Sequence, residues 1–126
     1  MKLKHDCVRD ILLTIEDIKE FNVFLPIQKL MKQDKLINYS KDDICYTLFK
    51  LEEAGFINLQ VASFQEGNFP LGITDMTYQG HEFLKNIRQS SVWSETKSLA
   101  SKVGSTSLTI LSVVAAGVVK AQLGLS

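Results

Sequence analysis

The sequence places a histidine next to a glutamate, His81 and Glu82, a pair of side chains that could transfer protons in an enzyme. Both follow Gly80 at the expected start of a helix. A zinc-binding helix would need a second histidine one turn away, and His5 lies far off in the sequence. No nucleophile elbow, phosphate-binding loop or dinucleotide glycine pattern accompanies the pair. We therefore expect His81 to pack or to form hydrogen bonds. We do not expect the protein to be an enzyme, to hold a metal ion or cofactor, or to bind a small-molecule substrate.

The two cysteines, Cys7 and Cys45, are the other side chains with reactive chemistry. They do not form a CxxC pair, and each falls at an inward position of a helical pattern. The first six residues are charged and amphipathic, unlike a signal peptide. We expect two buried free thiols in a cytoplasmic protein.

The composition is that of an ordinary globular protein of one-domain size. The chain has 126 residues, of which 45% are hydrophobic and 22% are charged. Fourteen basic residues balance fourteen acidic residues, so the formal net charge is zero. This balance removes the simplest argument for nucleic-acid binding, which is a strongly basic chain.

The first half of the chain begins with a helix predicted over residues 5–20, whose apolar side chains recur at spacings of three and four. Residues 21–38 fit two patterns, an extended segment or a short helix, and the sequence does not choose between them. Ser40 is a good N-cap for a second helix, which Gly55 ends as the C′ residue.

A β-hairpin is predicted to follow, with strands over residues 56–64 and 71–76 and a turn over 65–70. Thr77 then caps a helix over residues 78–89. The fold predicted for residues 1–90 is therefore mainly α with a small β-hairpin. This order of elements is typical of a winged-helix-like domain, in which the hairpin is the wing.

The helix from Lys41 onward would be the recognition helix if such a domain bound DNA. The residues expected to face outward and contact DNA or another partner include Lys41, Tyr46, Thr47 and Lys50. From Lys41 to Glu53, four acids outnumber two lysines, a local charge of −2. The hairpin carries no lysine or arginine, although contacts with phosphates usually require them. The fold favours DNA binding and the charge pattern opposes it.

Residues 91–126 are predicted to form a helical extension that packs on the domain or dimerises, with helices over 92–102 and 108–123. No charged side chain occurs between Val103 and Val119, so the last helix is apolar nearly all round and needs a covering surface. Its strongly apolar part, residues 110–119, is short for a membrane span, which makes membrane contact the weaker alternative. We expect burial in a homodimer or in the chain's own core. The predicted dimer interface consists of Leu108, Leu111, Val114, Ala115 and Val118.

Several stretches resemble the bacterial family of unknown function DUF2513. The resemblance rests on residues 5–13, Ile15 and Glu16, residues 39–44, Tyr46, Leu48, residues 53–57, Ile73 and Thr74, residues 78–84, Trp93 and residues 122–125. The most specific are the Glu-Ala-Gly run at residues 53–55 and the Gly-His-Glu-Phe-Leu run at residues 80–84. The resemblance implies a protein of bacterial or prophage origin and carries over no catalytic residue.

Two functions remain open from the sequence. The first is a regulatory winged-helix protein, homodimeric, that contacts DNA or a protein. The alternative is a phage- or prophage-type protein that binds and modulates a host or defence protein without reading DNA. The acidic recognition helix and the cation-free wing favour the alternative.

Overall fold

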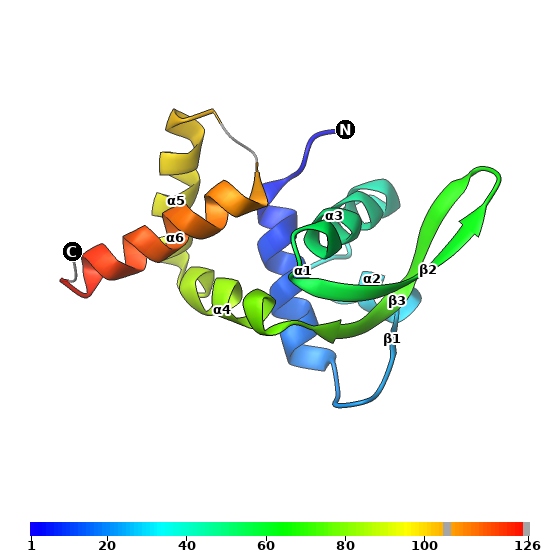
Figure 1. Ribbon diagram of the computed structural model, residues 1–126. Coiled ribbons are helices and arrows are strands. Elements are labelled where there is room, and N and C mark those ends of the chain that lie inside the picture. The colour runs from blue at the N-terminus through cyan, green and yellow to red at the C-terminus, as the bar shows by residue number, and fades with distance from the viewer. Residues whose placement is uncertain (105–106, 125–126) are drawn as a thin grey trace.

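The computed structural model describes residues 1–104 and 107–124 as a group of helices from which a small sheet projects at one side (Figure 1). The described residues form six helices and three strands. The helices are α1 (His5–Ile18), α2 (Ile27–Met31), α3 (Lys41–Glu53), α4 (Tyr78–Ile87), α5 (Ser90–Lys102) and α6 (Leu108–Gln122). The strands are β1 (Leu25–Pro26), β2 (Ile57–Phe64) and β3 (Gly67–Met76).

The strands form one antiparallel sheet in the order β1-β3-β2. The predicted hairpin is present, but β3 begins at Gly67 instead of Leu71, because Asn68 and Phe69 pair with Ser63 and Ala62. Strand β1 adds a third strand, so the sheet is larger than the small hairpin named in the predicted fold class. Residues 21–38 contain both a short strand and a short helix, the two structures that the sequence allowed for this segment.

Strand β1 can lie close to β3 because residue 72 is glycine. A Cβ atom at Gly72 would lie 2.2 Å from the carbonyl oxygen of Leu25 and 2.6 Å from Cζ of Phe24. Both distances are shorter than any van der Waals contact, so a side chain at this position would push β1 away. Gly72 thus allows the third strand to join the sheet.

The ends of α3 confirm the local predictions made from Ser40 and Gly55. Ser40 Oγ accepts a hydrogen bond of 3.0 Å from the backbone N–H of Asp43. Gly55 has φ of +81°, and the N–H of Phe56 donates to the carbonyl of Leu51 at 2.9 Å. These bonds satisfy backbone groups that the two helix ends would otherwise leave unpaired.

Helix α4 is held against the start of β2 by two small residues. The hydroxyl of Thr77 accepts from the N–H of Gly80 at 3.0 Å and donates to the carbonyl of Gly55 at 2.6 Å. A Cβ at Gly80 would lie 2.1 Å from the carbonyl oxygen of Phe56. Gly80 therefore allows the helix to approach the hairpin closely.

Helices α5 and α6 pack beside α4, and their buried side chains join the same apolar core as α1 and α3. Four of the five residues predicted for a dimer interface are buried inside their own chain. These four are Leu108, Leu111, Ala115 and Val118. This face of α6 is therefore covered by the chain's own core, which is one of the two coverings expected from the sequence; Val114 is half-buried. The opposite face leaves Ile110 and Val113 exposed.

Two arginines tie the end of α4 to α1. The guanidinium group of Arg9 donates to the backbone carbonyls of Ile87 and Arg88, at 2.9 and 2.6 Å. Arg88 in turn forms a bidentate ion pair with the carboxylate of Glu16. These contacts fix the helix that carries His81 relative to the end of α1. None of the described helices combines the length and the apolar character required to cross a membrane.

Candidate partner-binding site

Helix α3 presents only part of the surface predicted from the sequence. Lys41 is exposed, and Tyr46 and Lys50 are half-buried. Thr47 is 1% exposed, and its hydroxyl donates to the carbonyl of Asp43 at 2.6 Å. The expectation that Thr47 faces a partner is wrong, because it lies on the side of α3 that packs on the core.

Two of the lysines on or near this helix form ion pairs with neighbouring acids. Lys50 Nζ lies 3.1 Å from Oε2 of Glu53 and 5.3 Å from the ring centroid of Tyr46. Lys4 Nζ lies 2.7 Å from Oδ2 of Asp43, and this hydrogen bond lowers the pKa of the Asp43 carboxyl. A phosphate group approaching α3 would therefore compete with two existing ion pairs, which weakens the case for DNA.

The outward side of α3 also borders other segments of the chain. Tyr46 and Lys50 line a cavity of about 580 Å³ together with residues 1–3 and 107–109. The N-terminal segment and the start of α6 therefore stand beside the helix. A recognition helix that enters a major groove needs an open approach, which these two segments narrow.

The hairpin carries a second surface, which we call the hairpin patch: Phe64, Phe69 and Leu71. All three side chains are exposed, and Phe64 and Phe69 are 60% and 41% exposed. Phe69 pairs with Ala62 and Phe64 with Gly67, so the alternation of the strands places both rings on one face. Their ring centroids are 5.9 Å apart, within the range of favourable aromatic pairs.

Sequence reasoning did not identify the hairpin patch as a site. The alternation in β2 separates two faces, but it does not tell which face the helices cover. A signal was present in Phe64, directly before the turn at Gln65 and Glu66, and in Phe69 three residues after it, where polar residues are usual. Large aromatic side chains that are exposed together at a hairpin tip mark a site of interaction with a partner.

The hairpin and the elements on either side of it are also acidic. Residues 51–84 contain five acids and no lysine or arginine. Glu52 accepts a hydrogen bond of 2.9 Å from the N–H of Leu59, and Glu53 pairs with Lys50. Glu82 interacts with the hydroxyl of Tyr78, which raises the pKa of that tyrosine. Glu66 and Asp75 have no side-chain partner among the described residues.

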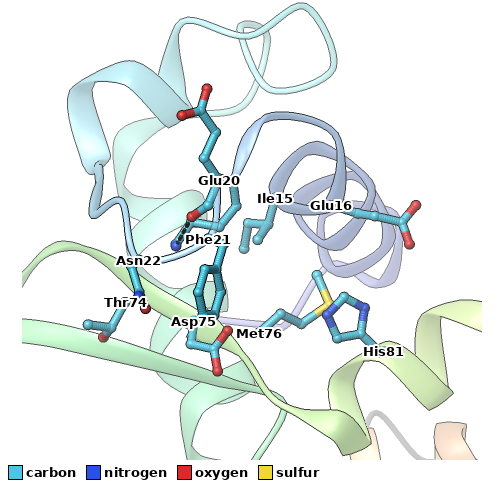
Figure 2. Close-up of a pocket in the computed structure, with 10 residues that line it drawn as sticks. Ile15, Glu16, Glu20, Phe21, Asn22, Thr74, Asp75, Met76 and His81 are labelled. Atoms are coloured by element: carbon cyan, nitrogen blue, oxygen red, sulfur yellow. Dashed lines mark hydrogen bonds between the residues drawn. The ribbon is translucent and has the colours of Figure 1, made fainter.

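A cavity of about 330 Å³ lies between the end of α1, β3 and the start of α4 (Figure 2). Ile15 and Met76 give it apolar lining, and the ring of Phe21 is directed toward Asp75. Phe21 is 92% exposed, so its ring is not used in the core. The carboxylates of Glu16 and Glu20 point away from this space (Figure 2), and Glu16 is bound by Arg88.

The side chains with catalytic chemistry are scattered. His81 is exposed at the edge of this cavity, whereas the neighbouring Glu82 is engaged with Tyr78. Cys7 is fully buried, and burial raises the pKa of its thiol to about 11. Cys45 is half-buried and is also a free thiol. The part of the chain that the structure describes contains no cluster of histidine, cysteine and acidic residues that could hold a metal ion.

Comparison with known families finds a match over most of the chain. A family model described as "Hypothetical protein (DUF2513)" matches residues 2–107. The matched region includes α1 to α5 and ends before α6, so the resemblance noted at residues 122–125 lies beyond it; residue 125 is also outside the described residues. No curated protein and no solved structure matches the chain.

Proposed function

The chain belongs to the DUF2513 family, and because the description of that family names no activity, we propose a function from the surface itself. The protein is a non-enzymatic binding protein of the winged-helix type that contacts a partner protein through the hairpin patch. The observation that carries the proposal is the exposure of Phe64 and Phe69 on a hairpin without cations.

The winged-helix assignment is supported by the order of elements. The chain runs helix, strand, helix, helix and hairpin, and the short first strand joins the sheet beside the second strand of the hairpin. In proteins of this type the helix before the hairpin and the wing are the usual contact surfaces. Here α3 and the β2–β3 hairpin occupy those positions.

A protein partner fits the wing better than a nucleic acid does. Exposed apolar side chains gathered on one element mark protein-interaction sites, and aromatic residues are enriched in such interfaces. Binding to DNA depends on lysine and arginine contacts with phosphates, and residues 51–84 offer none. The sequence-based alternative, a protein that binds and modulates another protein without reading DNA, therefore becomes the preferred function.

Site-specific photo-crosslinking in cells tests this proposal. A photo-crosslinking phenylalanine derivative would replace Phe64, and in a matched control it would replace Val113, which is exposed on α6. We expect a discrete protein adduct from position 64 that position 113 does not give. Equal adducts from both positions, or none from position 64, would refute the hairpin as the binding surface.

DNA binding remains the competing function, because Lys41 is exposed on α3. A gel-shift assay at low salt with mixed-sequence duplex DNA tests it separately. Binding that weakens steeply with salt and is lost in a Lys41→Glu, Lys50→Glu double variant would support DNA contact through α3. We expect no shift, since Lys50 is already paired with Glu53.

A further inference from the structure

We infer that the partner segment bound by the hairpin patch is apolar in its middle and carries a lysine or arginine at each end. This inference rests on the proposed function and specifies the chemistry of the partner. It starts from the two carboxylates of the hairpin that have no side-chain partner among the described residues, Glu66 and Asp75. The three other acids of residues 51–84 are engaged by Leu59, Lys50 and Tyr78.

The two carboxylates bracket the apolar surface along β3. Glu66 lies in the turn directly before β3, between Phe64 and Phe69 in the sequence, and Asp75 lies near the other end of that strand. Asp75 lies nine positions after Glu66, which corresponds to roughly 30 Å of extended chain. An extended segment of about the same number of residues could place one cation at each carboxylate.

The end at Asp75 has the features of a seat for a cationic side chain. The cavity there has a volume of about 330 Å³ and is lined by Ile15 and Met76, which suit the methylene groups of lysine or arginine. Phe21 directs its exposed ring toward Asp75 (Figure 2), so a cation at that carboxylate would also meet an aromatic ring.

The charge around the patch favours a basic partner over an acidic one. Glu66 and Asp75 would repel carboxylates or phosphates, and no cation within residues 51–84 would compensate them. Lys19 also lines the cavity and donates to the backbone carbonyl of Glu20 at 2.6 Å, but its positive charge is outnumbered there by the carboxylates of Glu16, Glu20 and Asp75. The complementary partner is thus basic as well as apolar.

Two synthetic peptides of about twelve residues test the inference. Both would have the same leucine- and tryptophan-rich middle, and they would carry either arginine or glutamate at the two ends. Fluorescence anisotropy with the full chain would measure their binding at low and moderate salt. We expect the arginine peptide to bind about tenfold more tightly than the glutamate peptide, since two exposed ion pairs differ between them.

Matched variants test which residues cause the preference for the arginine peptide and which cause binding itself. Glu66→Gln with Asp75→Asn should remove the preference for the arginine peptide, whereas Glu95→Gln, an exposed acid on α5, should leave it unchanged. Phe64→Ser with Phe69→Ser should abolish binding, whereas Val113→Ser should not. Circular dichroism would show that each variant keeps its helices.

The outcomes separate this inference from the proposed function. If both peptides bind equally and the phenylalanine variant loses both, the basic partner is refuted while the hairpin patch stands. If the phenylalanine variant binds as the wild type does, the hairpin patch itself is refuted. A failure of the arginine peptide to bind up to about 1 mM, the weak end of specific recognition, would overturn the inference.

Discussion

The indole N–H of Trp93 donates a hydrogen bond of 2.9 Å to Oδ1 of Asp6, and so joins α5 to the first turn of α1. Lys97 Nζ lies 2.8 Å from the same oxygen and 5.6 Å from the centroid of the indole ring. Trp93 is otherwise buried, so its ring packs in the core while its polar edge reaches an acid 87 residues away in sequence. One carboxylate thus anchors the C-terminal extension to the domain.

Replacing Trp93 by phenylalanine should separate the hydrogen bond from the packing. We expect Trp93→Phe to lower the free energy of unfolding by about 1–2 kcal/mol, and Trp93→Ala by about 3–5 kcal/mol. Urea unfolding followed by circular dichroism measures both changes. Asp17→Asn, on the exposed side of α1, serves as the control and should have little effect. A Trp93→Phe variant as stable as the wild type would contradict the role assigned to the bond.

The stability of the protein should fall in acid because of Asp6 and Glu16. Hydrogen bonds from Lys97 and Trp93 lower the pKa of Asp6, and the Arg88 guanidinium lowers that of Glu16. The unfolded chain, with ordinary values of 3.8 and 4.5, therefore binds protons before the folded chain does. The stabilisation is complete above these values and is lost as the pH falls through the lowered values of the folded state.

Melting temperatures measured between about pH 6 and pH 3 would test this dependence. We expect the curve of Asp6→Asn to be flatter than that of the wild type over the acid range. The difference should be modest, because Asp6 is largely exposed and water screens its ion pair. Parallel curves for the two proteins would show that Asp6 does not contribute.

Two glycines in helices should respond in opposite directions to alanine. Gly80→Ala should destabilise the protein by several kcal/mol, because the new methyl group would overlap the carbonyl of Phe56. Gly117→Ala should stabilise it by about 0.5–1 kcal/mol, since a Cβ at this position of α6 meets open space. Chemical denaturation of the two variants gives the comparison, and equal effects would contradict the close contact at Gly80.

Truncation of Leu111 should reveal whether α6 belongs to the chain's own core. Leu111 is fully buried, so Leu111→Ala should cost about 2–5 kcal/mol at every protein concentration. Val113→Ala, at a position 66% exposed, should cost little. Light scattering in parallel measures self-association. A loss of stability in Leu111→Ala that disappears at high protein concentration would instead indicate a dimer interface on this face.

Cys7 should react with thiol reagents only after unfolding. Its pKa of about 11 leaves about one thiolate in a thousand at pH 8, and its side chain is inaccessible. A Cys45→Ser variant isolates this thiol for labelling by an aromatic disulfide reagent. We expect slow labelling in buffer and rapid labelling in denaturant. Rapid labelling of the native variant would contradict the burial of Cys7.

Local signals in the sequence were sufficient to predict several features of the fold. Ser40 and Gly55 define the ends of α3 through bonds to residues three to five positions away, so a single sequence contains the required information. The position of strand β1 could not be predicted from the sequence, because two residues are too few to show a periodic pattern. Its place depends on Gly72, which is distant in sequence.

The binding surface was harder to predict, since it depends on which sides of the elements are covered. Thr47 was expected to face outward as a polar residue, but it satisfies its hydroxyl on the carbonyl of Asp43 and is buried. The apolar character of α6 was clear, whereas the choice of its covered side depends on the tertiary packing of α4 and α5. The hairpin patch could be identified only from the structure, which shows the side of the sheet that other elements leave uncovered.

The glycine at residue 72 also bears on how the protein stays in solution. β1 shields β3 along only two residues, Leu25 and Pro26, and the second of these has no N–H to offer a neighbouring strand. If a side chain at residue 72 displaced β1, backbone groups of β3 would be left open to pairing with strands of other molecules. Substitution of Gly72 should therefore show itself first as aggregation during expression, before any loss of helix content.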